Sequence, residues 1–329
     1  MKVIKSKIKN FPWLYWIYLF IVLTAWFAYM KANDLFYILD ENIAIIITMV
    51  FGSFIAGSSP EGSASIAYPI FTLYLDIMPD VARNFAFAIQ SIGMTSASIF
   101  ILNKKIKVDW NYIIYVTIGG LFGLVLGTYF FIPLVKPMVA KLIFVSLWLS
   151  FGIILYFEHR DQSRIIKDYI INIRQRDILY LLILGLVGGC ISSLFGTGIN
   201  IFTFCFMVIY YNVNEKVATP SSIIIMTIET IFGFFLHALV IRDMTPATYN
   251  MWLSCIPIVV FFAPLGTFIM NKLSNKHFSH FLYFIFIIQY VGAMFVIRPG
   301  LGYSLLSVGI IVCGIVFFRI LSKNKKVII

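Results

Sequence analysis

Apolar residues along the chain gather in twelve runs, and polar or charged residues separate these runs from one another. The runs cover approximately residues 12–30, 43–57, 62–77, 81–102, 111–133, 138–157, 178–195, 198–211, 217–240, 248–270, 279–297 and 300–321. Because a helix needs about 20 apolar residues to cross the hydrocarbon core of a bilayer, eight of the runs are predicted transmembrane helices. The other four, 43–57, 62–77, 178–195 and 198–211, are shorter, and they are predicted to form two pairs of half-length or tilted helices.

A short polar break separates the two members of each pair. The first break is the segment 58–65, Ser-Ser-Pro-Glu-Gly-Ser-Ala-Ser, and the second is the segment 195–200, Phe-Gly-Thr-Gly-Ile-Asn. Gly62 in the first break lies 136 residues before Gly198 in the second, and an alanine follows each of these glycines after 20 residues. This offset predicts an internal repeat, and interrupted helices at corresponding positions of two repeats indicate the binding site of a transporter.

The composition excludes a water-soluble protein. Of the 329 residues, 61% are hydrophobic and only 12% are charged, which is too few charges to cover a solvated surface. The net charge of +11 would suit a nucleic-acid-binding protein, but the lysines and arginines lie between the apolar runs, where they orient membrane helices. We therefore predict a polytopic membrane protein without a nucleic-acid partner. The four cysteines lie apart within apolar runs, so neither a metal site nor a cofactor is predicted.

The distribution of basic residues predicts the orientation of the chain in the membrane. Nineteen of the 25 lysines and arginines lie in the N-terminal segment, in the connections around residues 104–107, 158–177, 216 and 272–276, and in the C-terminal tail. Basic connections face the cytoplasm, so both termini are predicted to be cytoplasmic. It follows that the segment 43–77 enters the membrane from outside and that the segment 178–211 enters it from the cytoplasm.

These orientations define the predicted fold class and its domains. We predict an all-α polytopic membrane protein with two inverted-topology five-segment repeats, each containing a paired broken or hairpin helix, and one extra helix at each end. The predicted parts are an N-terminal basic segment with the first transmembrane helix, 1–42, the first repeat, 43–157, a cytoplasmic basic loop, 158–177, the second repeat, 178–297, and the last helix with the tail, 298–329.

The two breaks contain most of the residues that are predicted to bind a substrate. A helix that begins after Gly62 or Gly198 directs unpaired backbone N–H groups, such as those of Ile199 and Asn200, toward the break, and such a pocket favours an anion. The predicted substrate-binding residues are Ser58, Ser59, Glu61, Gly62, Ser63, Ser65, Gln90, Gly196, Thr197, Gly198, Asn200 and Ser222. The alternative is that small residues only permit tight helix packing, and Ser192, just before the second break, fits that alternative.

Two acidic residues within the apolar runs are candidates for proton coupling. Glu61 lies at the first break and is expected to carry the coupling proton or to steer the choice of substrate. Glu229 lies in the middle of a predicted transmembrane helix, where an unpaired charge would cost at least about 2.5 kcal/mol, and it is the second candidate. Near the outer helix ends, Asp80 and Arg83 are expected to form a surface ion pair, and His237 is expected at the surface or at an interface.

The order of these features resembles a known family. A Gly- and Ser-rich break, an apolar helix with a proline in the segment 68–71, Tyr-Pro-Ile-Phe, and two alanines after a short turn, Ala82 and Ala86, occur in a repeated unit. Over residues 43–297 this arrangement resembles the sulfite exporter TauE/SafE family of anion permeases. The resemblance implies two such repeats, a sulfur-containing or organic anion as substrate, a bacterial inner membrane, and coupling to a proton or ion gradient. The first break departs from the glycine run of the family because it contains Glu61.

The predicted function is that of a secondary transporter, which moves a small sulfur-containing or organic anion across the bacterial inner membrane and is coupled to an ion or proton gradient. Its predicted partners are the anion and the lipid bilayer, and a homo-oligomer is compatible with the sequence. An ion channel and an intramembrane enzyme that uses Glu61 and Glu229 stay open as alternatives. The enzyme is disfavoured because neither a hydrolase triad pattern nor a phosphate-binding loop is evident in the sequence.

Overall fold

The computed structural model describes residues 12–323 except 64–66, 68, 69, 73, 136, 161–165 and 171–173. Among the residues predicted to bind a substrate, Ser65 lies outside the described residues. The basic N-terminal segment and the end of the C-terminal tail lie outside them as well. Of the segment 68–71, which contributes to the family resemblance, residues 70 and 71 are described.

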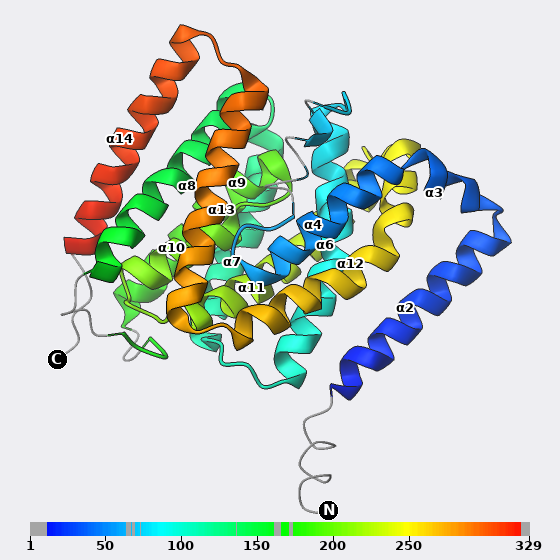
Figure 1. Cartoon of the computed structure of the whole chain (residues 1–329), viewed down its shortest axis with the longest axis horizontal. Coiled ribbons are helices and arrows are strands. Elements are labelled where there is room, and N and C mark those ends of the chain that lie inside the picture. The colour runs from blue at the N-terminus through cyan, green and yellow to red at the C-terminus, as the bar shows by residue number, and fades with distance from the viewer. Residues whose placement is uncertain are drawn as a thin grey trace, which may run out of the picture.

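Helices form most of the described chain (Figure 1). Their bounds are α2 Trp13–Ala32, η1 Leu35–Tyr37, α3 Ile38–Glu41, α4 Ile43–Ser58, α6 Pro79–Asn103, α7 Trp110–Leu126, η2 Gly127–Phe131, α8 Pro137–Arg160, α9 Gln175–Phe195, α10 Ile199–Ile209, α11 Glu215–Phe235, η3 Leu236–Ile241, α12 Pro246–Lys272, α13 Asn275–Ile297 and α14 Leu301–Lys323. Within the described residues, eight helices are long and apolar enough to cross a membrane, or nine if the bent pair Leu35–Glu41 and Ile43–Ser58 is one span. The prediction of an all-helical polytopic membrane protein is therefore confirmed.

The helix before the second break is longer than the apolar pattern predicts. The run 178–195 predicts a half-length or tilted helix, but α9 begins at Gln175 and has 21 residues, enough to cross the hydrocarbon core. It begins early because the Asp177 carboxylate accepts a hydrogen bond from the Arg174 backbone N–H at 2.8 Å and caps the polar first turn. The half-length prediction is therefore wrong for this helix, whereas α4 with 16 residues and α10 with 11 residues are short.

The helix bounds follow the offset found in the sequence. α6 and α11 begin at Pro79 and Glu215, and α7 and α12 begin at Trp110 and Pro246, so the members of both pairs are 136 residues apart. α7 packs most extensively against α9, and α12 packs most extensively against α4, and α9 and α4 are the helices that precede the two breaks. α7 and α12, which occupy corresponding positions at this offset, thus each pack against the helix that precedes a break. The inversion of the repeats in the membrane and the domain limits stay predictions.

Each helix that precedes a break is in backbone contact with the helix against which it packs most extensively. A Cβ atom at Gly119 of α7 would overlap the Leu182 carbonyl of α9, and a Cβ atom at Gly57 of α4 would overlap the Ala263 carbonyl of α12. Small residues permit so close an approach of two membrane helices. Gly57 and Gly119, which lie outside the breaks, therefore serve the tight packing that was the alternative to a binding role.

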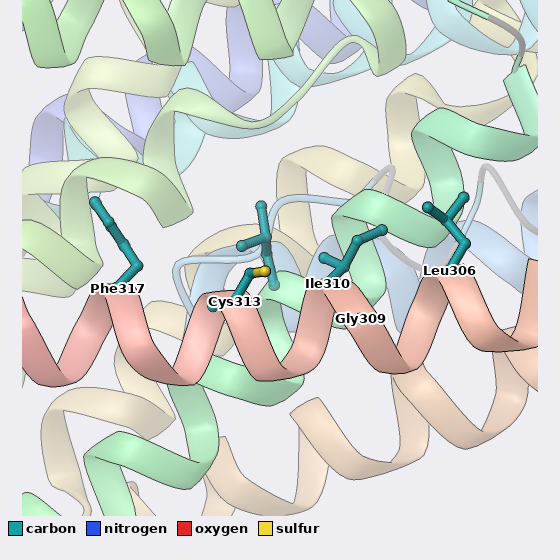
Figure 2. A pocket seen from close by; sticks show the side chains of 7 residues that line it. Leu306, Gly309, Ile310, Cys313 and Phe317 are labelled. Carbon is teal, nitrogen blue, oxygen red and sulfur yellow. The ribbon is translucent and has the colours of Figure 1, made fainter.

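At one side of the molecule, α13 and α14 both pack against α8 (Figure 1). The hydroxyls of Ser146 in α8 and Ser307 in α14 are hydrogen-bonded at 2.8 Å. Beside this contact lies an apolar groove with a volume of about 410 Å³. Figure 2 shows the α14 residues that line it, among them Leu306, Ile310, Cys313 and Phe317. An apolar lining at the periphery of a membrane protein suits contact with lipid acyl chains.

Candidate substrate site at the two helix breaks

The two helix breaks lie against each other in the interior of the protein. The Asn200 side chain at the second break donates a hydrogen bond through Nδ2 to the Pro60 carbonyl at the first break, at 2.6 Å. Six residues of the breaks are at most 2% exposed, namely Ser58, Ser59, Glu61, Ser63, Thr197 and Asn200. Tertiary folding thus brings together two segments that are far apart in the chain, and it excludes solvent from both.

Gly62 lies at a second close approach of the two breaks. Its φ angle of +74° lies in the left-handed region that favours glycine. A Cβ atom at this position would overlap the Thr197 hydroxyl of the second break. It would also lie 3.0 Å from Oε1 of Gln90 in α6 and 3.1 Å from Sδ of Met226 in α11. Gln90 and Met226 are themselves 136 residues apart, so corresponding positions of the two predicted repeats meet at Gly62.

Gln90, one of the residues predicted to bind a substrate, lies against both breaks. Its Nε2 donates hydrogen bonds to the carbonyls of Ala86 at 3.0 Å and Gly196 at 2.9 Å. Its Oε1 lies near Gly62 and is a buried atom without a hydrogen-bond partner in the described part of the chain. An unpaired buried acceptor costs about 1–3 kcal/mol, so this oxygen is available to a donor that enters the site.

The N-terminus of α10 is partly occupied by side chains of the protein itself. The Ile199 N–H donates to Oγ of Ser192 at 2.9 Å, and the Gly198 N–H donates to Oδ1 of Asn200 at 3.2 Å. The Thr197 hydroxyl donates to the same Asn200 oxygen at 3.2 Å. The prediction that the Ile199 N–H is free for an anion is therefore wrong. The Ile199 N–H is occupied because the preceding helix, α9, places the Ser192 hydroxyl beside the first turn of α10.

The hydroxyls of three predicted site residues donate to their own helices. Ser58 and Ser59 donate to a carbonyl of α4 at 3.3 and 2.9 Å, and Ser222 donates to a carbonyl of α11 at 2.8 Å. Serine hydroxyls in helices commonly form such local bonds. Ser59 also accepts a hydrogen bond from the Glu61 backbone N–H at 3.3 Å, so it shapes the first break. The hydrogen bond that the Ser222 hydroxyl donates, by contrast, lies within α11.

Glu61 is hydrogen-bonded to a helix of the second predicted repeat. The amide of Gln289 in α13, oriented with its nitrogen toward the carboxylate, donates to both Glu61 oxygens at 3.0 and 3.2 Å. The opposite orientation would place an acceptor against two acceptors. Both side chains are buried. Sequence reasoning missed Gln289, although a glutamine within the otherwise apolar run 279–297 was a signal that could have revealed it.

Glu229 lies in a second polar cluster, behind the second break. Its Oε2 accepts a hydrogen bond from the Ser192 hydroxyl at 2.9 Å, and the same hydroxyl accepts one from the Ile199 N–H. Its Oε1 has no hydrogen-bond partner within the described residues, and the residue is 1% exposed. A hydrogen-bonded chain thus connects the α11 carboxylate with the first residue of α10. Sequence reasoning assigned Ser192 to helix packing and missed this contact.

The N-terminal end of α6 is held by an ion pair next to the second break. Nη2 of Arg83 lies 3.1 Å from one Asp243 oxygen, and Nδ1 of His237 lies 2.9 Å from the other. Arg83 and His237 are buried, so the surface ion pair predicted for Arg83 and the surface alternative predicted for His237 are wrong. The reason is that Asp243, a half-buried residue in the connection between η3 and α12, supplies a charged partner for both. A Cβ atom at Gly196 would lie 2.7 Å from the Arg83 carbonyl, so this cluster adjoins the break.

Replacing Asp243 by asparagine is expected to destabilise the fold at neutral pH. Burial raises the pKa of Asp243, but the hydrogen bond and attraction of His237 and the charge of Arg83 outweigh burial and hold the pKa below its ordinary value of 3.8. A lowered carboxylate pKa stabilises the folded state above the ordinary pKa, and the contribution disappears as the pH falls through the lowered pKa. The Asp243→Asn variant should lose about 2 kcal/mol at neutral pH.

Thermal melting of the detergent-solubilised protein between neutral and acidic pH measures this effect. The difference between parent and variant should be constant at neutral pH and should shrink as the pH falls below 3.8. Asp80→Asn, which changes an exposed carboxylate in the first turn of α6, the helix of Arg83, is the matched control. Equal melting temperatures of the parent and Asp243→Asn at neutral pH would contradict the prediction.

The fold and the site define a class, namely polytopic membrane proteins in which two interrupted helices meet in the interior, an arrangement found in transporters. Residues 44–295 match the family described as Sulfite exporter TauE/SafE. The chain therefore belongs to this family of membrane transporters, as the resemblance predicted. The matched residues include both breaks. Neither a curated protein nor a solved structure matched the chain.

Proposed function

We propose that the protein is a secondary permease that moves a small sulfur-containing or organic anion across a bacterial inner membrane. The observation that carries the proposal is the direct contact between the two buried breaks through the Asn200 amide and the Pro60 carbonyl. Interrupted helices in the interior of a membrane protein supply backbone groups and polar side chains for a substrate. Membership in a family of membrane transporters supports the same function.

Two features of the breaks favour a small anion. α10 begins at the second break, so the positive end of its dipole lies there. Oε1 of Gln90, by contrast, is an acceptor that needs a donor. An anion that retains one O–H or N–H group satisfies both features. Its size is limited because the Gly62 position lacks room even for a Cβ atom beside Thr197.

Proton coupling is proposed to act through Glu229. A charged carboxylate in the middle of a membrane helix costs at least about 2.5 kcal/mol, so a change of its protonation state has a large effect on the free energy of the fold. A deprotonated Glu229 accepts a stronger hydrogen bond from Ser192, and Ser192 in turn holds the Ile199 N–H. The charge of Glu229 is thereby linked to the position of the second break.

Glu61 is proposed to influence which substrate binds. It lies at the first break, and its carboxylate is hydrogen-bonded to Gln289. Because a charged carboxylate repels an anion at the same break, an anion binds more readily when Glu61 is protonated. The substrate choice then depends on the state of Glu61, whereas the response to a proton gradient depends on Glu229.

The alternatives receive less support. Glu61 is bonded to Gln289, whereas Glu229 is bonded to Ser192 behind the second break, so each carboxylate has a partner of its own. A channel needs a continuous pore, whereas the two breaks are bonded to each other. Within the part of the chain that the structure describes, no three His, Cys, Asp or Glu side chains are grouped to hold a metal ion. We propose neither an enzymatic activity nor a cofactor.

Both termini are proposed to be cytoplasmic. In Figure 1, α2 begins and α6 connects to α7 on the lower side of the molecule, and α14 runs downward to its C-terminal end at the left. The connection between α6 and α7 contains Lys104, Lys105 and Lys107, and α14 ends at Lys323. Basic residues gathered on one face of a membrane protein support a cytoplasmic location of that face.

Uptake into proteoliposomes tests the proposed function. Radiolabelled sulfite, sulfonates and small carboxylates are offered to the reconstituted protein with and without an imposed pH gradient. We expect at least one of these anions to accumulate. We expect Asn200→Ala to reduce that uptake at least about tenfold, because the variant loses the bond to Pro60 and the acceptor for the Gly198 N–H.

Asn33→Ala is the matched control. Asn33 is exposed at the C-terminal cap of α2, and its side-chain amide donates a hydrogen bond to a carbonyl of that helix. Its uptake should equal that of the parent. Normal uptake by Asn200→Ala at equal expression would contradict the location of the site. Anion conductance without accumulation against a gradient would identify a channel instead.

A further inference from the structure

A partly polar cavity lies at the C-terminal ends of α8 and α14. Its volume is about 400 Å³. Its apolar lining consists of Ile154, Phe157 and Ile315, and its polar lining consists of Glu158, Arg319, Ser322 and Lys323. None of these residues lines the apolar groove of Figure 2, and none takes part in the proposed transport site.

The polar lining contains more positive than negative charge. Arg319 and Lys323 are four residues apart, so they lie one helical turn from each other on the same face of α14. Both are exposed, and within the described chain neither forms an ion pair or a hydrogen bond. Glu158, the carboxylate of the cavity, accepts a hydrogen bond from the Ser322 hydroxyl. The two cations are therefore available to an anionic group.

The polar and apolar parts of the cavity lie at different depths. α8 and α14 run parallel, because Ser146 contacts Ser307 near their beginnings and Ser322 contacts Glu158 near their ends. On both helices the apolar lining residues precede the polar ones. Since the helices end at this point, the polar part lies toward the membrane surface and the apolar part toward the acyl chains.

We propose that this cavity binds an anionic phospholipid, with Arg319 and Lys323 as ligands of the headgroup phosphate and the apolar lining in contact with an acyl chain. Guanidinium and ammonium groups form charge-assisted hydrogen bonds with phosphate oxygens, and basic pockets between membrane helices recognise lipid headgroups. A free phosphate would use the charged half of the lining alone. The apolar groove of Figure 2 offers no charge, so it provides no preference among headgroups.

Native mass spectrometry of the full chain in a neutral detergent tests the proposal. Phosphatidylglycerol and phosphatidylcholine with identical acyl chains are added in equal amounts. We expect the parent to retain at least about five times more phosphatidylglycerol than phosphatidylcholine, since each cation near a membrane surface attracts anionic lipid. The double variant Arg319→Gln/Lys323→Gln should retain the two lipids equally.

The double variant Lys272→Gln/Lys276→Gln is the matched control, because it removes the same charge from the adjoining ends of α12 and α13, outside the cavity. It should retain phosphatidylglycerol as the parent does. Three results would overturn the proposal: equal retention of both lipids by the parent, unchanged preference in Arg319→Gln/Lys323→Gln, or an equal loss in the control. Displacement of the lipid by an equal concentration of glycerol phosphate would also overturn it, in favour of a site for free phosphate.

Discussion

Replacing Gly62 by alanine is expected to abolish anion uptake while membrane insertion stays intact. The φ angle of +74° would cost a residue with a Cβ atom about 1–2 kcal/mol. The added methyl group would also overlap the Thr197 hydroxyl and lie 3.0 Å from Oε1 of Gln90, so it would push the two breaks apart. Because a displacement of about 1 Å in a site can reduce a rate about 100-fold, we expect a loss of at least that size.

Proteoliposome uptake at matched expression measures this loss. Gly309→Ala is the control, since a Cβ atom at Gly309 of α14 would meet no other atom within 4 Å. Its uptake should equal that of the parent. If Gly62→Ala transports anions normally, the first break does not form part of the substrate site, and the proposed function loses its structural basis.

Replacing Glu229 by glutamine is expected to uncouple transport from the proton gradient. Glutamine has nearly the shape of the protonated acid but cannot release a proton, so the chain through Ser192 to Ile199 stays in one state. Uptake driven by the anion gradient should persist, whereas stimulation by an imposed pH gradient should disappear.

Glu61→Gln should retain that stimulation and change the relative uptake of different anions, because Glu61 lies at the first break beside Gln289.

The two variants are compared in the same vesicles with and without a pH gradient. Glu41→Gln, which changes an exposed carboxylate at the end of α3, controls for the loss of one negative charge. If Glu61→Gln loses the stimulation and Glu229→Gln retains it, the coupling role belongs to Glu61. If both variants respond as the parent does, proton coupling through either carboxylate is wrong.

The residues of the two breaks could be predicted because their signal is local. Gly62 and Gly198 interrupt apolar runs at one offset, and such interruptions are visible without any knowledge of tertiary contacts. Gln90 could be predicted as well, because a buried amide in a membrane helix needs a partner. Its partner, the Gly196 carbonyl, could not be read from the chain, since many carbonyls lie at a similar depth.

The sequence by itself determined that the protein is a helical membrane protein with two helix breaks, because runs of about 20 apolar residues and the polar interruptions between them require no partner to be recognised. Only the tertiary structure decided which groups those breaks contact. Gln289 donates hydrogen bonds to Glu61, Ser192 accepts the hydrogen bond of the Ile199 N–H, and Asp243 forms an ion pair with the buried Arg83. Each of these contacts joins different helices or connections, and it depends on how the helices cross. A single polar residue in an apolar run reports that it needs a hydrogen-bond partner, but only the packing of the helices determines which partner lies within reach.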